Sequence, residues 1–515
     1  MKRGELVCAT IGLAALALAA WLLAATSPPR REEIVTVSGC ELRMTILGRD
    51  DARAKAVLFH GLTANRRTML QLGRTLAGQM QVFILDHPGH GDSTQPFSYE
   101  RAEACAATAV NWLEQQGRIR LENTALIGHS MGAGIAIRLA DQFPTAATVS
   151  ISTAMRKPVV GNPLRLEPVA LPRRMPVNLF LINAEYDWLE LKEVSRRMVH
   201  AAGGERYDAQ DFDQRRAFRW ETFRGATHTS LIFDSQVHAA IRWWIDKAMG
   251  SVPTPDGSLA PRILGIVAGL AGLLLVFPLV ASLVCGASGE KQAVPAHAAG
   301  SWTAFAVWPA AALVAVLLQF RFTTLGPVVR MYSGDYLASV LMVVGVVVMV
   351  WQVRARHAVP LQTNWGLKAV AAGALLGMAA MLAFGGWLNW QITNTWLNAP
   401  RWWRFTVLVP LVLPYFVAEE IALGVPPSAW LARAGRFARF LTLRAILWLA
   451  MAFGLFVLGS AQVLMVLLVI YMVAFSIAQR AGMDAVRRRT SSAAAAAVFG
   501  AILAAWFIAA VFPIT

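Results

Sequence analysis

The sequence predicts an α/β domain with a mainly parallel sheet, followed by an all-α membrane bundle. Hydrophobic residues make up 56% of the 515 residues and charged residues only 15%, against roughly 45–50% and 25% in soluble domains. Residues 27–250 contain 28 of the 47 Lys and Arg and 24 of the 31 Asp and Glu. Short β-type segments alternate with amphipathic stretches in this charged block, whereas long apolar segments fill the remainder.

An apolar segment opens the chain. Residues 7–26 contain no charged side chain and follow Lys2 and Arg3. A membrane-spanning helix needs about 20 such residues, whereas the core of a cleaved signal peptide is usually about 7–15 residues long. We therefore expect residues 1–26 to form an uncleaved transmembrane anchor, with cleavage near Thr26 as the alternative.

Residues 27–250 contain eight segments of β type. Amphipathic stretches lie between most of the later ones, which predicts a mainly parallel sheet covered on both faces. The first two flank Ser38-Gly39-Cys40, and we expect them to form an antiparallel hairpin at one edge. The predicted strands are Ile34–Val37, Leu42–Leu47, Ala56–His60, Val82–Asp86, Thr124–Gly128, Ala147–Ser152, Leu179–Asn183 and Arg219–Phe223.

A linker and further apolar segments follow. Residues 251–261 carry three prolines and a glycine, which is typical of a linker. Residues 262–515 then contain eight apolar segments long enough to span a membrane, so that with the anchor we expect nine spans. The eight lie near residues 263–285, 302–320, 335–352, 367–388, 405–424, 443–458, 461–479 and 493–512.

The connections between these spans differ in basic charge. If the N-terminus is cytoplasmic, the cytoplasmic segments contain 14 Lys and Arg, whereas the opposite loops of the bundle contain only Arg321, Arg330, Arg401 and Arg404. Short cytoplasmic loops are enriched in Lys and Arg, and this enrichment sets the orientation of the chain. We therefore expect a multi-pass protein of the plasma (inner) membrane, with residues 27–250 outside the cytoplasm.

Four cysteines are too few for a disulfide framework. Cys8 and Cys285 lie in apolar segments, which leaves Cys40 and Cys105 in the α/β domain. We expect these two to be unpaired thiols. A single disulfide between them is the alternative, which spacing alone does not decide.

Residues Gly128 to Gly132, with the sequence Gly-His-Ser-Met-Gly, lie between a predicted strand and a predicted helix. A nucleophilic serine on a sharp strand-to-helix turn needs small neighbours two residues to either side, because the tight backbone leaves no room for side chains. In this context the pattern predicts that Ser130 is a nucleophile.

A serine nucleophile needs a base, and the base needs a carboxylate that orients it. In this arrangement the chain order is serine, acid, histidine. Asp187 follows one late predicted strand and His228 follows the next. Both therefore lie at the edge where open α/β sheets place their sites. We expect His228 to be the general base and Asp187 to orient it.

His60 and Gly61 stand at the end of the predicted strand Ala56–His60. A tetrahedral intermediate needs donors aimed at its negative charge, each contributing roughly 3–4 kcal/mol. We expect the backbone N–H groups of Leu62 and Met131 to supply them, with Gly61 allowing the main chain to approach closely.

Five motifs occur in the order and spacing of one family: Phe59-His60-Gly61, Asp86 to Ser93, Gly128 to Gly132, Asn183 to Asp187, and Gly225 to His228. By these motifs, residues 34–248 resemble the α/β-hydrolase superfamily, especially its monoacylglycerol-lipase-like and serine-aminopeptidase-like members. The resemblance implies an α/β-hydrolase fold and a serine hydrolase of esterase or lipase type. Ala184 departs from the glycine that the family usually has before its acid, which makes Glu185 the nearest rival of Asp187.

The family inserts its cap where this chain has Thr153–Pro176, a short and basic region. We expect a solvated loop there. The alternative is a membrane-facing mouth that attracts anionic lipid, since each basic residue near such a surface adds about 1 kcal/mol.

No metal, cofactor or nucleic acid is indicated as a partner. The sequence contains no HExxH and no paired CxxC. Residues 27–250 account for only +4 of the net charge of +16 and contain no basic run interleaved with aromatics. His129, beside the serine, is expected to pack rather than to react.

Glu419 and Glu420 lie in a predicted span, where charges are costly. The pair resembles the Glu-Glu motif of CAAX-protease-like membrane proteases. However, Gly424 stands where that family has arginine, and no histidine follows His357. The sequence therefore does not match that family, and we expect the two carboxylates to pair with Arg433 or Arg436.

The sequence thus predicts a membrane-bound serine hydrolase that cleaves an ester or amide through an acyl-enzyme. Its expected partners are membrane lipids and a lipid or acylated envelope substrate, because tethering keeps the site near the bilayer. Two alternatives stay open. One is an acyltransferase that uses the same triad, and the other is a transporter or flippase whose hydrolase domain processes the cargo.

Overall fold

The computed structural model describes residues 3–159, 162–203, 209–250, 259–285, 307–322, 326–354, 366–459, 465 and 468–515. The chain divides into two compact units. The first comprises Ala19–Val267, Leu388–Trp396 and Pro513–Thr515, and the second comprises Met1–Leu18, Ala268–Trp387 and Leu397–Phe512. The domain boundaries expected near residues 26, 250 and 261 stay predictions, and most of the expected linker lies outside the described residues.

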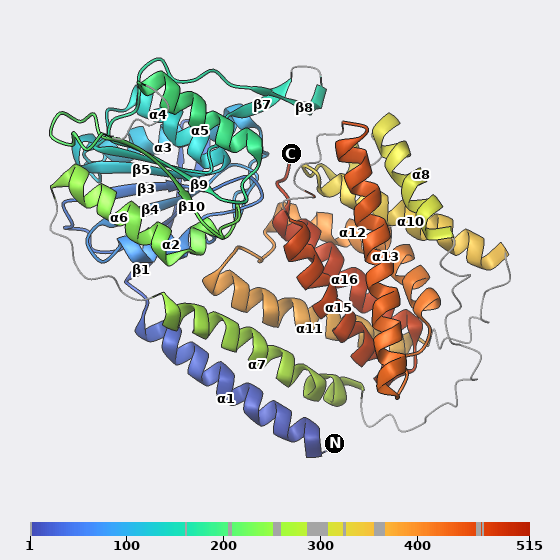
Figure 1. Ribbon diagram of the computed structural model, residues 1–515. Helices are drawn as coiled ribbons and strands as arrows, with labels where there is room; N and C mark the ends of the chain where they lie inside the picture. Colours follow the sequence, from blue (N-terminus) through green and yellow to red (C-terminus); the bar gives the residue numbers. More distant parts are fainter. Residues whose placement is uncertain are drawn as a thin grey trace. The chain divides into compact units, whose positions relative to one another are not determined.

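An eight-stranded sheet forms the centre of the first unit, in the order β1-β2-β4-β3-β5-β6-β9-β10 (Figure 1). The pairs β1–β2 and β2–β4 are antiparallel, and the remaining neighbours are parallel. All eight expected strands are present, with the hairpin at one edge. Their bounds are β1 (Arg30–Val37), β2 (Cys40–Leu47), β3 (Lys55–Phe59), β4 (Gln81–Asp86), β5 (Thr124–His129), β6 (Ala147–Ile151), β9 (Leu179–Ala184) and β10 (Phe218–Phe223).

Helices cover both faces of this sheet, because side chains of a strand alternate between its faces (Figure 1). In β9, Phe180 and Ile182 pack in a core with α2 and α6 residues, whereas Leu179 and Leu181 pack with α4 and α5 residues. The helices are α2 (Leu70–Leu76), α3 (Tyr99–Gln115), α4 (Met131–Gln142), α5 (Leu189–Ala202) and α6 (Ser235–Met249).

A short hairpin lies between β6 and β9. It consists of β7 (Arg156–Val159) and β8 (Asn162–Pro168), which pair antiparallel. The expectation of a loop throughout Thr153–Pro176 was therefore wrong for the middle of this region. Prolines in this region disfavour a helix. They are tolerated in a two-stranded hairpin because both of its strands are edge strands.

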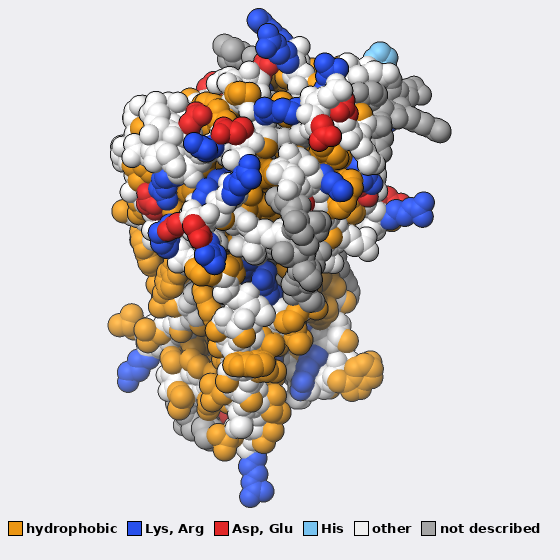
Figure 2. Space-filling view, turned by 90° about the vertical axis from the view of Figure 1, so that its left-hand side faces the viewer, with side chains coloured by type: hydrophobic (Ala, Val, Ile, Leu, Met, Phe, Trp, Pro, Cys, Tyr) orange, Lys and Arg blue, Asp and Glu red, His pale blue; other side chains and the backbone are white. Residues whose placement is uncertain are grey.

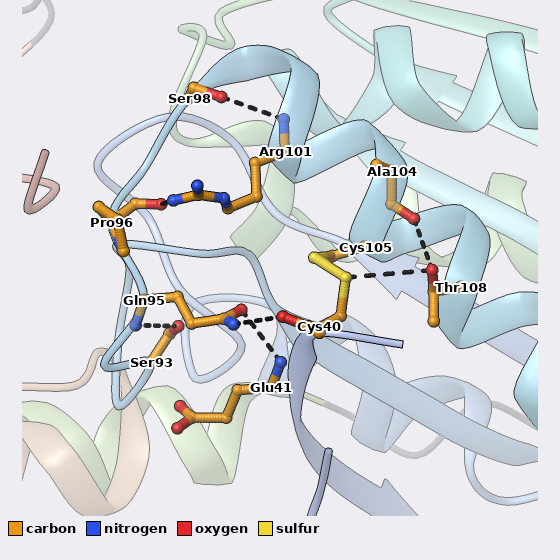
Figure 3. The surroundings of a disulfide bond; sticks show 11 residues. Cys40, Glu41, Ser93, Gln95, Pro96, Ser98, Arg101, Ala104, Cys105 and Thr108 are labelled. Carbon is orange, nitrogen blue, oxygen red and sulfur yellow. Dashed lines mark hydrogen bonds between the residues drawn. A yellow bond between two sulfur atoms is a disulfide. The ribbon is translucent and has the colours of Figure 1, made fainter. Parts of the chain in front are cut away.

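Cys40 and Cys105 form a disulfide with their Cα atoms 5.4 Å apart, so the expectation of two unpaired thiols was wrong (Figure 3). Cys40 begins β2 and Cys105 lies in α3, and the contact between these two elements is a property of the fold. Beside the bond, Gln95 accepts the N–H of Glu41 over 3.0 Å and donates to Gly39 O over 2.6 Å. These contacts tie the segment before α3 to the start of β2.

Seven of the described helices are long and apolar enough to cross a membrane, including the expected anchor α1. One region of the face in Figure 2 carries mainly hydrophobic side chains, and another carries intermixed Lys, Arg, Asp and Glu. On α1, large apolar side chains such as Ile11 and Trp21 are exposed, as lipid contact requires. The seven are α1 (Arg3–Ala25), α7 (Ala260–Cys285), α10 (Gly334–Arg354), α11 (Leu367–Gln391), α12 (Ala399–Leu423), α13 (Trp430–Phe456) and α16 (Ala493–Val511).

Two of the nine expected spans are not among these seven. The first corresponds to α8 (Val307–Arg321), a shorter apolar helix whose preceding residues lie outside the described part. The second, expected at 461–479, overlaps α15 (Val469–Thr490), whose last turn carries three consecutive arginines, and most of residues 461–467 lie outside the described part. We expected the span to end at residue 479 because the apolar residues stop there, whereas the helix continues through charged residues to Thr490.

The partners expected for Glu419 and Glu420 were wrong. Glu419 pairs with Arg444 over 3.0 Å, and Glu420 pairs with Arg487 over 3.1 Å and with Arg480. Arg433 instead donates to backbone carbonyl groups. Sequence proximity favoured the nearest basic residues, whereas helix packing brings arginines from α13 and α15 to α12.

Two late segments of the chain belong to the first unit, which the sequence did not indicate. In Leu388–Trp396, Asn394 Nδ2 donates to Asp92 Oδ1 over 2.8 Å. Near the C-terminus, the N–H of Ile514 donates to Gly89 O over 3.0 Å, and Ile514 O accepts the N–H of Phe97 over 2.7 Å. Both segments therefore contact and stabilise the loop that follows β4.

Candidate active site

Four neighbouring parallel strands end at one edge of the sheet. Because β5, β6, β9 and β10 lie side by side, the residues that follow them lie at the same edge. Ser130 follows β5, Ser152 follows β6, Asp187 follows β9 and His228 follows β10. The topology thus gathers the three predicted catalytic residues, together with a serine that the sequence did not single out.

Ser130 stands on a strained turn. Its backbone has φ 55° and ψ −117°, in a region that residues other than glycine rarely adopt. A Cβ at Gly128 would lie 2.1 Å from Gly132 O, and one at Gly132 would lie 2.3 Å from Phe59 O. Both glycines are therefore sterically required. The turn leaves Ser130 partly exposed at the start of α4.

Asp187 and His228 are directly bonded. The Nδ1–H of His228 donates to Asp187 Oδ1 over 2.9 Å, and both residues are buried. The other carboxylate oxygen, Oδ2, accepts three hydrogen bonds. They come from Ser152 Oγ over 2.5 Å, Ala184 N over 2.9 Å and Asn183 Nδ2 over 3.1 Å.

This hydrogen bonding decides the charge of the acid. Burial acts to raise the pKa of Asp187, but the bonds from His228, Ser152 and Ala184 outweigh it and lower the pKa below its ordinary value. The carboxylate is therefore ionised at neutral pH and keeps the histidine proton on Nδ1. Nε2 of a neutral His228 is then free of a proton and able to accept one.

Ser152 and Asn183 are the residues that sequence reasoning missed. Ser152 is buried and has φ 50°. Trp220 Nε1 donates to Asn183 Oδ1 over 2.8 Å, and this bond fixes the orientation of the Asn183 side-chain amide. Each is a polar residue at or next to the carboxyl end of a buried strand. That position in the sequence was the one signal that could have indicated a role for either residue at the site. Ala184, the departure from the family pattern, supplies its N–H to Asp187 without needing to be glycine.

Glu185, the predicted rival, lies elsewhere. It is exposed, and its Oε2 accepts the N–H of Gly225 over 2.7 Å. The geometry therefore brings Asp187, and not Glu185, to His228.

His129 packs beneath the site. Its Nε2–H donates to the carbonyl of His228 over 2.9 Å, and the two rings are 4.8 Å apart. Burial, together with the nearby His228, lowers the pKa of His129 to about 3. A neutral, buried ring in this position supports the main chain of His228.

The predicted oxyanion donors flank the serine. A Cβ at Gly61 would lie 2.9 Å from Ser130 Cβ, so the main chain that leads to Leu62 passes directly beside Ser130. Met131 is the first residue of α4, where backbone N–H groups have no partner within the helix. Leu62 and Met131 stay the predicted oxyanion donors.

The His60 side chain connects two loops beside the site. The ring is fully buried, its Nδ1–H donates to Gly61 O over 2.8 Å, and its Nε2 accepts the N–H of His87 over 3.0 Å. Burial lowers the pKa of His60 well below its ordinary value. A neutral His60 therefore links the loop after β3 to the loop after β4.

A buried ion cluster holds these loops together. Asp86 accepts the N–H of Arg66 over 2.7 Å and that of Asp92 over 3.1 Å. The Arg66 guanidinium contacts Asp86 as well, and it donates to Asp92 over 2.6 Å. The cluster positions the chain that carries Gly61 and Leu62. Among the described residues, no group of three His, Cys, Asp or Glu is placed to hold a metal ion.

The sheet order, the strained serine after β5 and the acid–histidine pair are those of α/β proteins with a nucleophile at the carboxyl edge. Residues 56–262 match the model of the family described as "Alpha/beta hydrolase family". Residues 56–262 therefore lie in a domain with the α/β-hydrolase fold, and the chain joins that fold to apolar helices of membrane-spanning length.

Curated relatives match a limited part of the chain. An uncharacterized protein of Mycobacterium tuberculosis is 32% identical over 110 residues, which cover 21% of this chain and 30% of that protein. The dihydrolipoyllysine-residue acetyltransferase component of the acetoin cleaving system of Cupriavidus necator is 30% identical over 128 residues, 25% of this chain and 32% of that protein. The chain thus spans about a third of the length of these relatives.

Solved structures resemble the fold. An esterase of Pyrobaculum calidifontis is 17% identical, with a TM-score of 0.35, covering 48% of this chain and 95% of that one. A bacterial membrane phospholipase A is also 17% identical, with a TM-score of 0.32, covering 48% of this chain and 93% of that one. At these identities the likeness concerns the fold alone.

Proposed function

We propose that this protein is a membrane-bound serine hydrolase that cleaves an ester or amide through an acyl-enzyme. The observation that carries the proposal is the 2.9 Å bond between His228 and Asp187, at the sheet edge where Ser130 stands on its strained turn. A serine, a histidine oriented by a carboxylate, and nearby main-chain donors are the parts that acyl transfer requires.

The chemistry follows from these positions. Ser130 Oγ attacks the carbonyl carbon while His228 Nε2 takes its proton, and the N–H groups of Leu62 and Met131 stabilise the oxyanion. Collapse breaks the bond to the alcohol or amine, which leaves with the proton from His228. Water then attacks the acyl-enzyme in the same way, releasing a carboxylic acid and restoring Ser130.

The substrate is proposed to be a lipid or an acylated component of the cell envelope. Apolar helices of membrane-spanning length occur at the start of the chain and after the hydrolase domain, so the domain is tethered from both sides. Such tethering concentrates the site at the bilayer and favours substrates that reside there. Residues Arg156, Arg173 and Arg174 of the region between β6 and β9 add positive charge that would attract anionic lipid.

The hydrolase domain is proposed to lie outside the cytoplasm. Disulfides such as Cys40–Cys105 persist in oxidising compartments. Of the 14 basic residues assigned to the cytoplasmic side, Arg436, Arg444, Arg480 and Arg487 are buried in the bundle, which leaves ten. On the opposite side Arg401 and Arg404 are buried, which leaves two. The bias keeps its direction when the arginines that are buried among the described residues are left out.

Of the alternatives, acyl transfer to an acceptor other than water uses the same residues and stays open. A transporter is less favoured, because a transport path calls for a polar cavity through the bundle. A small pocket between α10, α12, α13, α15 and α16 is lined mainly by apolar side chains, although Arg444, Trp448, Ser476 and Gln479 also line it.

A fluorophosphonate probe tests the proposal, because it modifies an activated serine covalently. The native full-length protein should be labelled, Ser130→Ala should abolish labelling, and Ser195→Ala should leave it unchanged. Ser195 is a buried serine on α5 and serves as the matched control. An unlabelled native protein, or a labelled Ser130→Ala variant, would refute the proposal. Lipid profiling of cells lacking the protein would then identify the accumulated substrate class.

A further inference from the structure

Two large apolar side chains are exposed beside Asp187. Among the described residues from Arg30 to Gly250, the exposed large apolar side chains are Ile34, Tyr186 and Leu189. Tyr186 is 65% exposed and directly precedes Asp187, and Leu189 is 83% exposed and follows it by two residues. Single exposed apolar side chains are common on protein surfaces, whereas a group of them often marks an interaction site. The position of this pair therefore indicates a partner at the carboxyl edge of the sheet.

The main chain holds Tyr186 in its outward position. The N–H of Tyr186 donates to Ala226 O over 3.0 Å, which ties it to the loop that carries His228. The next side chain, that of Asp187, is buried and bonded to His228. The main chain therefore cannot turn the tyrosine ring inward without displacing Asp187. The exposure of the ring is a property of the folded loop.

Leu189 lies on the polar face of α5. Glu193 and Arg196, four and seven residues further along, share this face, are exposed and form an ion pair with each other. Met198 is buried and lies nine residues, or about two and a half turns, after Leu189, so it occupies the opposite face. An amphipathic helix carries polar side chains on its exposed face. Packing within the domain therefore does not account for a leucine at this position.

Basic residues outnumber acidic ones at the surface around these two side chains. Arg156 of β7 pairs with Glu190 over 3.1 Å, and Lys192 donates to the carbonyl of Glu185. The Glu185 side chain accepts the N–H of Gly225, and the residue before Gly225 is an exposed arginine. This surface therefore is not repelled by anionic head groups of a bilayer. The basic residues are Arg156, Lys192 and Arg224, and the acidic ones are Glu185 and Glu190.

We propose that Tyr186 and Leu189 form a rim that enters the head-group region of a lipid bilayer and gives the site access to substrates that reside there. A tyrosine presents an apolar ring and a polar hydroxyl, which suits the boundary between head groups and acyl chains. Transfer of a leucine side chain from water to apolar surroundings is favourable. The partner is a bilayer because apolar helices of membrane-spanning length lie before and after the hydrolase domain.

This inference rests on the proposed hydrolase function and specifies where its substrate resides, namely within the membrane rather than dissolved in water. The reaction itself needs only the residues at the sheet edge. The rim acts on the approach to the site, so its loss should affect membrane-resident substrates and spare dissolved ones.

Fluorescence quenching tests contact of the rim with lipid independently of catalysis. The fluorophore bimane is attached at Leu189→Cys in the full-length protein, which also carries Cys8→Ser and Cys285→Ser so that no other free thiol reacts. In nanodiscs of phosphatidylcholine and phosphatidylglycerol, lipids with a nitroxide on the head group should quench this fluorescence. Glu122→Cys is the matched control, because Glu122 is exposed and precedes β5 at the opposite edge of the sheet, and its fluorophore should keep its intensity. Equal quenching at both positions, or none at position 189, would overturn the inference.

Two fluorophosphonates of different chain length test the consequence for the site. An ethyl fluorophosphonate dissolves in water, whereas a hexadecyl fluorophosphonate partitions into the nanodisc. Tyr186→Ser/Leu189→Gln should slow labelling by the hexadecyl probe about tenfold, because apolar contact with the bilayer is lost, and should change labelling by the ethyl probe less than about twofold. Ile34→Gln removes a similarly exposed apolar side chain from β1, at the other end of the sheet, and should change neither rate.

The outcomes separate this inference from the proposed function. A native protein that neither probe labels would refute the hydrolase function, and the quenching experiment would still decide whether the rim contacts lipid. Slower hexadecyl labelling without quenching at position 189 would show that the rim binds the alkyl chain of the substrate, which would overturn the contact with the bilayer. Equal slowing of both probes by Tyr186→Ser/Leu189→Gln would show a general disturbance of the site and would overturn the preference for membrane-resident substrates.

Discussion

His228 and Asp187 are 41 residues apart in the chain, and the Nδ1–H of His228 donates to Asp187 Oδ1 over 2.9 Å. The second carboxylate oxygen is occupied by Ser152, Asn183 and the N–H of Ala184. One oxygen thus orients the histidine, and the other anchors the carboxylate to the sheet. From this division we predict that Asp187, and not Glu185, is required for turnover.

Asp187→Asn should lower turnover of an ester substrate by about 10⁴-fold, because the amide no longer holds the reactive tautomer of His228 or stabilises its charged form. Glu185→Gln is the matched control and should change turnover by less than about tenfold, since Glu185 is exposed and only accepts a backbone N–H. Steady-state kinetics of both purified variants measures this. The reverse ranking would transfer the role to Glu185.

Removing the disulfide should destabilise the hydrolase domain. For a bond that links residues 65 positions apart, chain-entropy arguments give a loss of about 4 kcal/mol. The Cys40→Ser/Cys105→Ser variant should therefore unfold at a lower temperature than the native protein. Cys8→Ser/Cys285→Ser removes the two unpaired thiols and should match the native protein. Complete alkylation of Cys40 and Cys105 in the native, unreduced protein would contradict the pairing.

Acid should destabilise the domain through its buried histidines. Burial lowers the pKa of His60, His87 and His129, so each stays neutral in the folded protein well below pH 6.5. The unfolded chain binds the extra protons, and the free energy of unfolding therefore falls as the pH falls below about 6.5. Between pH 7.5 and 5 each histidine should contribute a loss of about 2 kcal/mol.

The unfolding midpoint of the full-length protein, measured across this pH range, checks that expectation. His87→Gln should retain a smaller pH dependence than the native protein, because one of the three groups no longer titrates. His200 has an exposed side chain on α5, so His200→Gln is the matched control and should keep the native dependence. A midpoint that rises on acidification would contradict the prediction.

The hydrolase domain should lie outside the cytoplasm. A reporter that is active only outside the cytoplasm should be active when fused after Gly250 and silent when fused after Arg489. Large domains translocate largely regardless of their own charge, so the basic residues of the hydrolase domain do not oppose this orientation. An inactive first fusion with an active second would invert the topology, and the proposal of an envelope substrate would then be withdrawn.

Local patterns in the sequence located the strands of the sheet and predicted Ser130 as the nucleophile. Short β-type segments that alternate with amphipathic stretches located all eight strands of the sheet, because the apolar side chains that a buried strand needs are present in its own sequence. The elbow around Ser130 was equally local, since Gly128 and Gly132 exclude side chains at contacts of 2.1 and 2.3 Å within one turn and its neighbouring strand. The order of Ser130, Asp187 and His228 followed from the fold class.

Tertiary structure alone decided the pairings between distant elements. Cys105 meets Cys40 because α3 packs on β2, and Ser152 reaches Asp187 because β6 and β9 are neighbours. Likewise Glu419 pairs with Arg444 from α13, rather than with the nearer Arg433 or Arg436. Periodicity shows which face of an element is buried, but which element covers that face depends on packing over the whole unit.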